Sequence, residues 1–376
     1  MRIALINTSK KNSIYPLGLL KIGQWQKSKG NECKLFNLEL PKKGEFDEIW
    51  ISTLFTFDIP KQLGIATEAL KRSNVVRVGG IASSLIPNPF KKLGCVVHVG
   101  LLKGAEKFNP DYSLLSEIPK YSISHTSRGC SRKCGFCMVS KLEPEFHQRE
   151  NWERDLNDSK QIKFFDNNWL AKGEELVFKD IEKLKKLVLD KKISSIDFNQ
   201  GLDCRLMTME IAKELKDIPC DPVRFAFDGM HEDKYFQNAI ELMVKYSNKK
   251  YFTNYVLYNY KDSPEDFYYR LKEHSRLSEK LNISCLAFPM RFQPILEWDS
   301  LREHVGIRWT IKQKKGFMRI LDTQAISGII NLKTIKEFQY WFTESAEKFA
   351  SLISWEKVGE YSDRKAGLKR IKKYGK

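Results

Sequence analysis

The stretch that decides the fold of this chain reads Arg128-Gly129-Cys130-Ser131-Arg132-Lys133-Cys134-Gly135-Phe136-Cys137. Its cysteines are separated by three and then by two residues, a spacing that rarely arises by chance in a chain with 8 cysteines in 376 residues. Three thiolates leave one iron of a four-iron cluster open for an outside ligand. A zinc site would need a fourth ligand, and no further Cys or His follows until His147. The pattern favours an iron–sulfur cluster over zinc or over three unrelated buried thiols.

The cysteine loop follows the first of six predicted strands, and predicted helices at about residues 173–190, 208–217, 231–247 and 263–280 alternate with the later ones. The last of these helices opens with Ser263-Pro264-Glu265-Asp266, which predicts a capping box. Six strand–helix units predict a partial (β/α)6 TIM-type barrel over residues 121–295, with ligands at the carboxyl ends of its strands. The six strands are predicted at Ser122–Thr126, Ile162–Phe165, Ser195–Asn199, Val223–Asp228, Phe252–Tyr258 and Ser284–Pro289.

The chain before the barrel also alternates strands with helices, which predicts an α/β domain with a parallel sheet. Residues 1–108 have the size and order of a flavodoxin-like, doubly wound domain, and residues 109–120 are predicted to be a linker. Residues 296–376 form a basic and mainly helical extension. We expect five of its apolar residues to face a core because they lie at helical spacing: Ile335, Phe338, Phe342, Phe349 and Ile353.

Composition limits the class of protein. Apolar residues make up 42% of the chain, which is enough for sizeable cores and excludes a disordered protein. No run of eighteen apolar residues exists, so we expect no transmembrane helix. The N-terminus runs quickly into Lys10-Lys11 and does not resemble a signal peptide. We therefore expect a cytoplasmic protein, in which cysteines serve as thiols or metal ligands and not as disulfides.

The positive charge lies on the two flanks of the chain. Residues 1–120 carry +8 and residues 296–376 carry +7, whereas residues 121–295 carry only +2. Such flanks are expected to attract a phosphate backbone, so nucleic acid is a candidate partner. A basic surface that only keeps the protein soluble is the alternative. The last thirteen residues contain seven of the cations: Arg364, Lys365, Lys369, Arg370, Lys372, Lys373 and Lys376.

The cysteine motif, with Phe136 before its last cysteine, resembles the signature of the radical S-adenosylmethionine (SAM) enzymes, and the resemblance extends over most of the chain. It implies a [4Fe–4S] cluster on Cys130, Cys134 and Cys137, whose open iron binds the amino and carboxylate groups of SAM. It also implies reductive cleavage of SAM to a 5′-deoxyadenosyl radical, which abstracts hydrogen from a substrate. An electron donor of the flavodoxin or ferredoxin type would follow from this chemistry.

Polar motifs at the ends of the barrel strands supply the residues that the resemblance assigns to SAM. Asp166-Asn167-Asn168 ends the second strand, where many family members hold the methionine ammonium; a turn rich in Asp and Asn is the alternative. Arg205, after the third strand, would pair with the methionine carboxylate; a local pair with Asp203 is the alternative. The expected SAM-binding residues are Phe136, Asp166, Asn167, Asn168, Asp203 and Arg205.

The N-terminal domain resembles that of the cobalamin-binding branch of the superfamily. Pro16-Leu17-Gly18-Leu19-Leu20 and Val78-Gly79-Gly80 match its usual landmarks. The Asp-x-His-x-x-Gly motif, whose histidine binds cobalt, is absent, because residues 8–13 contain no histidine. Bound cobalamin and a degenerate domain that shapes the substrate cleft are both open, and the missing ligand favours the second.

The remaining cysteines, Cys33, Cys95, Cys204, Cys220 and Cys285, form no local pair, so a second cluster is not expected and buried thiols are. The leading hypothesis is a radical SAM enzyme that modifies a substrate, with nucleic acid favoured by the charged flanks. A radical SAM enzyme acting on a small molecule or peptide, including a cobalamin-dependent methyltransferase, is the alternative. A non-enzymatic iron–sulfur sensor and a zinc-stabilised nucleic-acid-binding protein are further classes.

Overall fold

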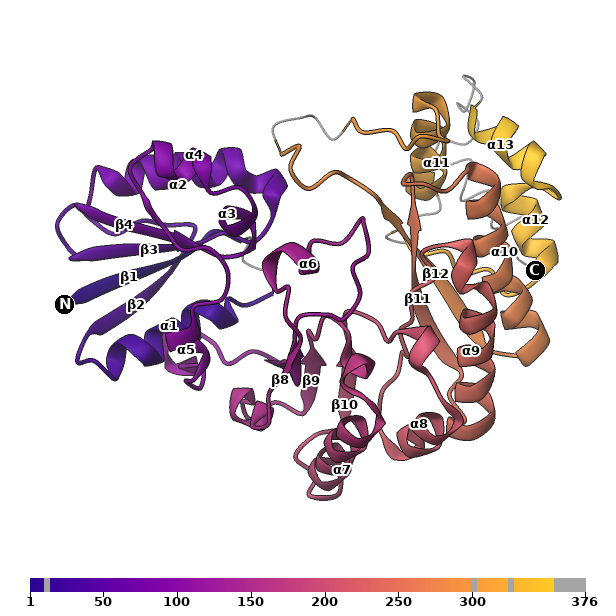
Figure 1. Ribbon diagram of the computed structural model, residues 1–376, viewed down its shortest axis with the longest axis horizontal. Helices are drawn as coiled ribbons and strands as arrows, with labels where there is room; N and C mark the ends of the chain where they lie inside the picture. The colour runs from indigo at the N-terminus through magenta and orange to yellow at the C-terminus, as the bar shows by residue number, and fades with distance from the viewer. Residues whose placement is uncertain (10–13, 299–302, 324–327, 355–376) are drawn as a thin grey trace. The chain divides into compact units, whose positions relative to one another are not determined.

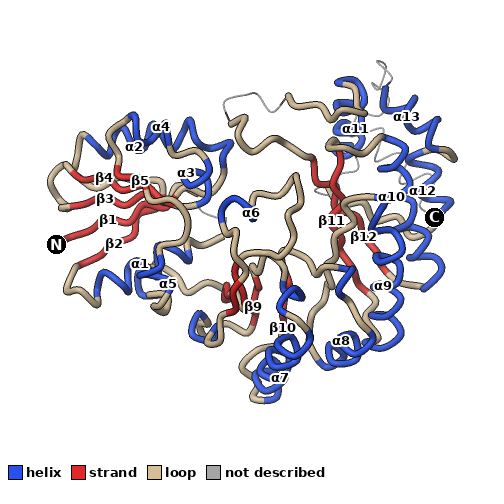
Figure 2. Tube along the Cα trace, viewed as in Figure 1, coloured by secondary structure: helices blue, strands red, loops and turns tan. Residues whose placement is uncertain are grey.

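The computed structural model describes residues 1–9, 14–298, 303–323 and 328–354. The chain divides into two compact units. The first holds Met1–Asn167 and a short segment that begins at Pro294, and the second holds Asn168–Gln293 and the chain from Glu303 onward. Figure 1 labels the helices and strands, and Figure 2 separates them from the loops by colour.

A five-stranded sheet opens the first unit, and every neighbouring pair in it is parallel. Its strand order, β2-β1-β3-β4-β5, is the order of flavodoxin-like domains. Such an order reverses between β1 and β3, and ligands of open α/β sheets bind beside this point, outside the carboxyl ends of the strands. The strands are β1 (Arg2–Asn7), β2 (Glu32–Asn37), β3 (Glu48–Ser52), β4 (Val75–Gly79) and β5 (Val96–Val97).

Helices cover both faces of this sheet, as Figure 1 shows. Because side chains alternate along a strand, Ile3 and Leu5 pack toward Leu19 of α1 (Leu17–Lys27), while Ala4 and Ile6 join the core on the other face. That second core contains apolar residues of α2 (Ile59–Leu70) and α4 (Asn88–Lys92). Two further short helices are α3 (Ile81–Leu85) and α5 (Lys103–Glu106).

The rest of the first unit surrounds the cysteine loop. Strand β6 (Ser122–Ser124) pairs in parallel with β9 (Gln161–Phe164), and β7 (Ser127–Arg128) pairs antiparallel with β8 (His147–Gln148). The chain between β7 and β8 carries the three motif cysteines and α6 (Val139–Leu142). Two 3-10 turns, η2 (Tyr112–Leu114) and η3 (Trp152–Asp155), complete this part of the chain.

The second unit repeats strand and helix. Strands β11 (Tyr251–Tyr258) and β12 (Ser284–Arg291) pair in parallel, with α10 (Pro264–Leu281) between them in sequence. Helix α10 begins with the predicted capping box of Ser263 and Asp266. The remaining elements before β11 are η4 (Trp169–Lys172), α7 (Glu174–Leu189), β10 (Ser195–Phe198), η5 (Cys204–Leu206), α8 (Met209–Glu214), η6 (Leu215–Asp217), η7 (Met230–Glu232) and α9 (Asp233–Ser247).

An aromatic core joins α10 to the C-terminal helices α11 (Ile311–Thr323), α12 (Ile335–Phe342) and α13 (Ala346–Ser354). Four of the five apolar residues predicted to face a core are buried, namely Phe338, Phe342, Phe349 and Ile353. Ile335, at the first position of α12, is only partly buried. The helical spacing therefore predicted this core and not an exposed aromatic surface.

The α/β class with parallel sheets is confirmed, and most predicted elements lie within two residues of those observed. Residues 223–228, predicted as a strand, form only isolated bridges, such as Val223 with Phe252 and Ala226 with Tyr255. The two compact units divide after Asn167, inside the predicted barrel. Within the predicted linker, Asp111 is buried and pairs with Lys27 at the end of α1, at 2.5 Å. No helix among the described residues has the length and apolar character needed to cross a membrane.

Candidate functional site

The three motif cysteines lie on one loop and are each partly exposed, whereas the other five cysteines are buried. The loop turns back on itself, because the Cys137 amide donates to the Cys134 carbonyl at 3.0 Å. The Arg132 amide approaches Cys130 Sγ at 3.3 Å. Within the described chain, no three His, Cys, Asp or Glu side chains are grouped to hold a single metal ion. Thiolates that bind a cluster each ligate a different iron, so they need not converge on one point.

Burial makes the other cysteines poor metal ligands, because the thiolate is the ligand form. It raises the pKa of Cys33 to about 11 and that of Cys220 to about 11. It also raises the pKa values of Cys95, Cys204 and Cys285. The prediction that these five are buried thiols is confirmed.

Gly129 lies where the two arms of the cysteine loop cross, against the backbone of Glu145. Its φ is +75°, and a Cβ at this position would lie 2.1 Å from the backbone oxygen of Glu145. No side chain fits there without moving the backbone, so the crossing of the two loop arms requires glycine. The sequence analysis had no signal for this contact, because Glu145 is sixteen residues away.

Asp166, predicted to contact SAM, is almost fully buried and tied to the chain that leads into the cysteine loop. Its carboxylate accepts hydrogen bonds from the backbone amides of Thr126 and Ser127, at 3.0 and 2.6 Å. Both hydroxyls also donate to it, each at 2.7 Å. These bonds fix the end of β6 against the end of β9, so Asp166 orders the backbone just before Arg128.

Glu143, which follows α6, holds three parts of the loop together. Its carboxylate accepts from the Gly129 amide at 2.9 Å and from Asn167 Nδ2 at 2.8 Å. It also lies 3.5 Å from the guanidinium of Arg128. The predicted SAM residue Asn167 is thus tied to the same carboxylate as the residue before Cys130. Phe136, on the loop itself, is partly exposed.

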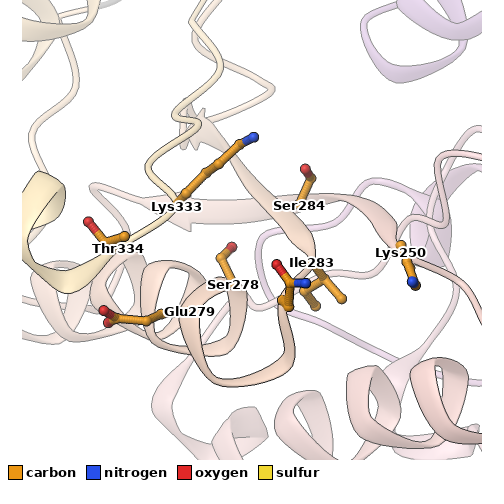
Figure 3. Close-up of a pocket in the computed structure, with 8 residues that line it drawn as sticks. Lys250, Ser278, Glu279, Ile283, Ser284, Lys333 and Thr334 are labelled. Carbon is orange, nitrogen blue, oxygen red and sulfur yellow. The ribbon is translucent and has the colours of Figure 1, made fainter. Parts of the chain in front are cut away.

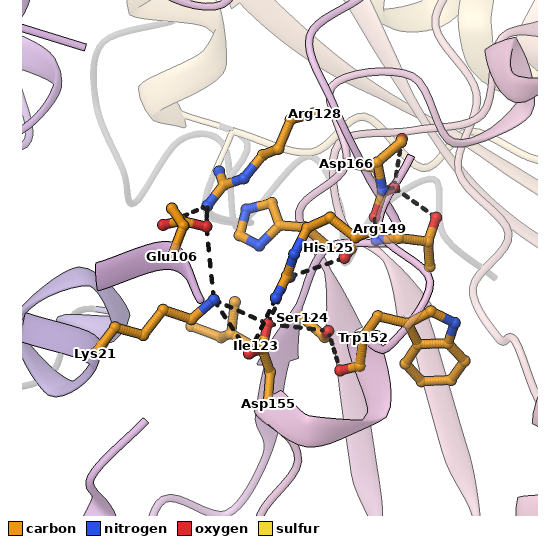
Figure 4. Close-up of polar contacts among 12 residues, drawn as sticks. Lys21, Glu106, Ile123, Ser124, His125, Arg128, Arg149, Trp152, Asp155 and Asp166 are labelled. Carbon is orange, nitrogen blue, oxygen red and sulfur yellow. Dashed lines mark hydrogen bonds and ion pairs between the residues drawn. The ribbon is translucent and has the colours of Figure 1, made fainter. Parts of the chain in front are cut away.

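A network of ion pairs reaches Arg128, which precedes the cysteine loop (Figure 4). Lys21 of α1 is 1% exposed and contacts Asp155 at 3.1 Å and Glu106 at 3.6 Å. Arg149 pairs with the same Asp155 at 2.7 Å, and Arg128 pairs with Glu106 at 3.2 Å. The network therefore connects α1 and α5 to the residue two positions before Cys130.

His125 lies within this network. Burial, together with the charges of Arg128, Arg149 and Lys21, holds its pKa well below the usual range, so the imidazole is neutral. Its Nδ1 is buried and makes no hydrogen bond to the described part of the chain. Its carbonyl accepts from Arg149 at 3.0 Å.

In the second unit, the remaining predicted SAM residues form one connected group. Asn168 Nδ2 donates to Asp203 at 3.0 Å, and Arg205 binds both oxygens of Asp203 at 2.7 and 3.0 Å. Arg205 also lies 3.1 Å from Glu232. Hydrogen bonding to Asp203 raises the pKa of Arg205. The local Asp203–Arg205 pair considered as an alternative is therefore present, and Arg205 bridges two carboxylates.

Asp228 lies next to this group, at the end of the segment that runs beside β11. Its Oδ1 accepts from the Leu257 amide at 3.2 Å, and its own amide donates to Glu232 at 2.7 Å. Burial, and then the charge of Glu232, raise the pKa of Asp228 to about 7. The fully buried Arg270 binds the carbonyls of Phe227 and Leu257, at 2.9 and 2.6 Å. The sequence analysis gave Asp228 no defined role.

A cavity of about 400 Å³ lies elsewhere in the second unit, at the amino ends of β11 and β12 (Figure 3). Lys250, Ser284 and Lys333 line it, together with Glu279 and Thr334. None of the predicted cluster or SAM residues borders it.

The six predicted SAM residues thus fall into two groups, and their role toward SAM stays a prediction. Phe136, Asp166 and Asn167 belong to the cysteine loop and its supports. Asn168, Asp203 and Arg205 form a separate connected set in the second unit. The supporting residues that the sequence analysis missed come from distant positions with no spacing pattern: Lys21, Glu106, His125, Glu143, Arg149 and Asp155.

No family model matches the chain, and no curated protein matches it. Solved structures, by contrast, match the chain. A structure of the radical S-adenosylmethionine methyltransferase TsrM from Kitasatospora setae, with cobalamin and a [4Fe-4S] cluster bound, aligns with a TM-score of 0.61 and 11% identity. The alignment covers 95% of this chain and 86% of that one. The chain therefore shares its fold with this TsrM structure. The resemblance drawn from the cysteine motif and the N-terminal domain is confirmed at the level of the fold.

A second structure of TsrM, with tryptophan substrate and the SAM analogue aza-SAM bound, aligns with a TM-score of 0.58 and 11% identity. It covers 78% of this chain and 73% of that one. Within this shared fold, the donor set on the cysteine loop fits an iron–sulfur cluster. It comprises three partly exposed thiols on one closed loop.

Proposed function

We propose that the chain is a radical SAM enzyme whose Cys130, Cys134 and Cys137 hold a [4Fe–4S] cluster. One observation carries the proposal: three partly exposed cysteines lie on a closed loop after β7, in a chain that shares the fold of a radical SAM methyltransferase over 95% of its length. The predicted (β/α)6 layout of residues 121–295 is part of this proposal. A sensor that only binds a cluster would not require the polar groups that end the strands of the second unit.

The cluster, when bound, supplies the electron for reductive cleavage of SAM. The chain's own residues then have two tasks. Asp166 and Glu143 hold the backbone on either side of the cysteine loop. Arg205 offers the charge that a SAM carboxylate requires, although in this structure it is already shared between Asp203 and Glu232. A flavodoxin- or ferredoxin-type donor is the proposed source of electrons.

Cobalamin-dependent methyl transfer is a second candidate function, because the carboxyl edge of the N-terminal sheet is apolar and exposed. Phe55 and Phe57, which follow β3, stack with ring centroids 5.0 Å apart and are 40% and 48% exposed. Ile81, after β4, and Val99, after β5, are also exposed. Large apolar groups at this edge suit a broad, flat ligand beside the reversal of strand order. The TsrM structure holds cobalamin, and the proposal extends this to the present chain.

The substrate proposal keeps both alternatives. The seven cations of residues 364–376, which favour nucleic acid, lie outside the described residues. TsrM has been solved with tryptophan as substrate, which supports the small-molecule alternative.

Iron and sulfide analysis of the anaerobically purified protein tests the proposed function. We expect about four irons and four sulfides per chain, with absorbance near 400 nm. Replacing Cys130, Cys134 and Cys137 together with Ala is expected to abolish iron binding. Replacing the buried Cys95 with Ala is the matched control and is expected to retain it. A full cluster in the triple variant would contradict the assignment.

The same preparation tests the cobalamin candidate. Wild-type protein is expected to retain cobalamin through gel filtration, with its visible spectrum intact. A variant with Phe55 and Phe57 replaced by Ala is expected to lose it while it retains iron. Absence of cobalamin from the wild-type protein would remove the second candidate and leave the first.

A further inference from the structure

The ion pairs that reach Arg128 form a chain that begins in the N-terminal domain. Lys21 lies on α1, the helix that packs on the first sheet, and Glu106 ends α5. The Lys21 ammonium lies 3.6 Å from Glu106, and Glu106 receives both hydrogen bonds from Arg128 Nη2, at 3.2 and 3.3 Å. Arg128 is followed in the chain by Gly129 and then by Cys130. Two ion pairs, Lys21–Glu106 and Glu106–Arg128, thus connect the Lys21 ammonium of α1 to the residue two positions before Cys130.

The ion pairs of the network match three cations with three carboxylates, and its members range from almost fully buried to 24% exposed at Glu106. Lys21, Arg128 and Arg149 supply three cations, and Glu106, Asp155 and Glu143 supply three carboxylates. Lys21 and Asp155 are each 1% exposed, and Arg128 is 12% exposed. Charges in such surroundings act over longer distances than charges at a surface, because little water screens them. His125 adds no charge, since these cations keep it neutral.

Glu106 is held as a carboxylate by its partners. Burial alone would raise its pKa, but the charges of Arg128 and Lys21 outweigh this effect and the pKa is lowered overall. The reduction potential of an iron–sulfur cluster depends on the net charge around it. Reduction of [4Fe–4S]²⁺ to [4Fe–4S]¹⁺ adds one electron, so nearby positive charge favours the reduced form and nearby negative charge opposes it.

We propose that Lys21 and Glu106 are positioning residues of the N-terminal domain that act through Arg128 to set the reduction potential of the cluster. This inference rests on the proposed function, because it requires the cluster on Cys130, Cys134 and Cys137. The N-terminal domain would then have a task that does not depend on cobalamin, because charges on its helices α1 and α5 would set the reduction potential of the cluster.

The network allows a single charge to be removed without stranding its partner. When Lys21 is replaced with Met, Asp155 keeps Arg149 at 2.7 Å and Glu106 keeps Arg128 at 3.2 Å. When Glu106 is replaced with Gln, the amide oxygen has the same place in space and still accepts from Arg128. Both variants change charge with little change in volume and leave each remaining charge with a partner, so we expect a smaller loss of stability than a stranded buried charge would cause.

The test is a redox titration of the reconstituted cluster, monitored by electron paramagnetic resonance, with titanium(III) citrate as the one-electron reductant. We expect Lys21→Met to shift the midpoint to a more negative potential and Glu106→Gln to a more positive one. The expected change is a few-fold to tenfold in the ratio of reduced to oxidised cluster, where tenfold corresponds to 59 mV for one electron. The double variant is expected to return close to the wild-type midpoint, because its charge is again balanced.

A purely structural role would give a different pattern. Disruption of the loop would move both single variants in the same direction and the double variant furthest, and this result would overturn the proposal. Unchanged midpoints in both single variants would overturn it as well. Lys29→Met, which removes an exposed cation just after the same helix, is the matched control and is expected to leave the midpoint unchanged. If the wild-type protein assembles no cluster, the proposed function fails. If it assembles a cluster but the Lys21 and Glu106 variants have the wild-type midpoint potential, only this inference is contradicted.

Discussion

The Asp166 carboxylate accepts hydrogen bonds from both the backbone amide and the hydroxyl of Ser127, at 2.6 and 2.7 Å. A residue expected at the cofactor therefore joins the end of β9 to the approach of the cysteine loop. The same carboxylate also receives two bonds from Thr126. Its structural task is established by these four bonds, and any contact with SAM would be additional.

Replacing Asp166 with Ala is expected to lower the free energy of unfolding by about 3 kcal/mol, because it leaves buried amides and hydroxyls without their acceptor. Iron content should fall with it, since the backbone before Cys130 loses its anchor. Urea denaturation and iron analysis measure the two effects. Asp158→Ala, at an exposed carboxylate of the same unit, is the control and should change neither. Wild-type stability in the Asp166 variant would show that the four bonds contribute little.

Replacing Arg205 with Ala is expected to destabilise the fold by about 2 kcal/mol, because Asp203 and Glu232 lose the cation between them. The loss is smaller than for a fully buried pair because Arg205 is 19% exposed. Arg308→Ala breaks the surface pair with Asp266, where Arg308 is 59% exposed, and should cost under about 1 kcal/mol. Equal losses in the two variants, measured by urea denaturation, would argue against a bridging role for Arg205.

The stability of the protein is expected to depend on the ionisation of Asp228. Its pKa is about 7 in the folded chain and about 3.9 when unfolded, so the folded state binds the proton more tightly. Stability from this group is fully present below about pH 4 and is lost as the pH rises through about 7, with a slope of at most about 1.4 kcal/mol per pH unit.

Asp228→Asn should remove this slope, so the difference in melting temperature between variant and wild type should grow in favour of the variant from pH 5 to pH 8. The exposed Asp217, replaced in the same way, is the control and should keep the wild-type slope. Parallel curves for Asp228→Asn and wild type would mean that Asp228 titrates as an ordinary carboxyl.

The basic C-terminus provides a test of the nucleic-acid alternative. If residues 364–376 contact phosphates, affinity for labelled RNA should fall steeply with salt, with a log–log slope near −0.7 per phosphate contacted. Deleting these residues should flatten the slope, because seven cations leave together. Fluorescence anisotropy at several salt concentrations measures it. No binding at about 50 mM salt would favour a small-molecule or peptide substrate.

Periodic patterns in the sequence predicted most of the fold because they report local rules. Alternating strands and helices gave the N-terminal sheet, and Ser263 with Asp266 gave the start of α10. The helices α3, α4 and α5 were missed because each has only four or five residues, which is too short for a periodic pattern.

The candidate site was predicted only where its residues share one stretch of sequence. The cysteine spacing is such a stretch, and it pointed to the fold that the comparison with TsrM supports. Lys21 and Asp155, by contrast, are 134 residues apart and meet only after folding. Asp166 and Arg205 were recognised as polar strand ends, but their partners Ser127 and Glu232 could not be inferred, because pairing across strand ends leaves no local pattern.

Gly129 has a consequence for how motifs of this kind are used to annotate genomes. The glycine is required because its loop crosses the backbone at Glu145, a contact between two stretches of the chain itself. A descendant of this protein that had lost all three cysteines would therefore still be under pressure to retain Gly129. A retained glycine in a related sequence therefore indicates the shape of the loop, whereas only retained cysteines indicate that iron is bound.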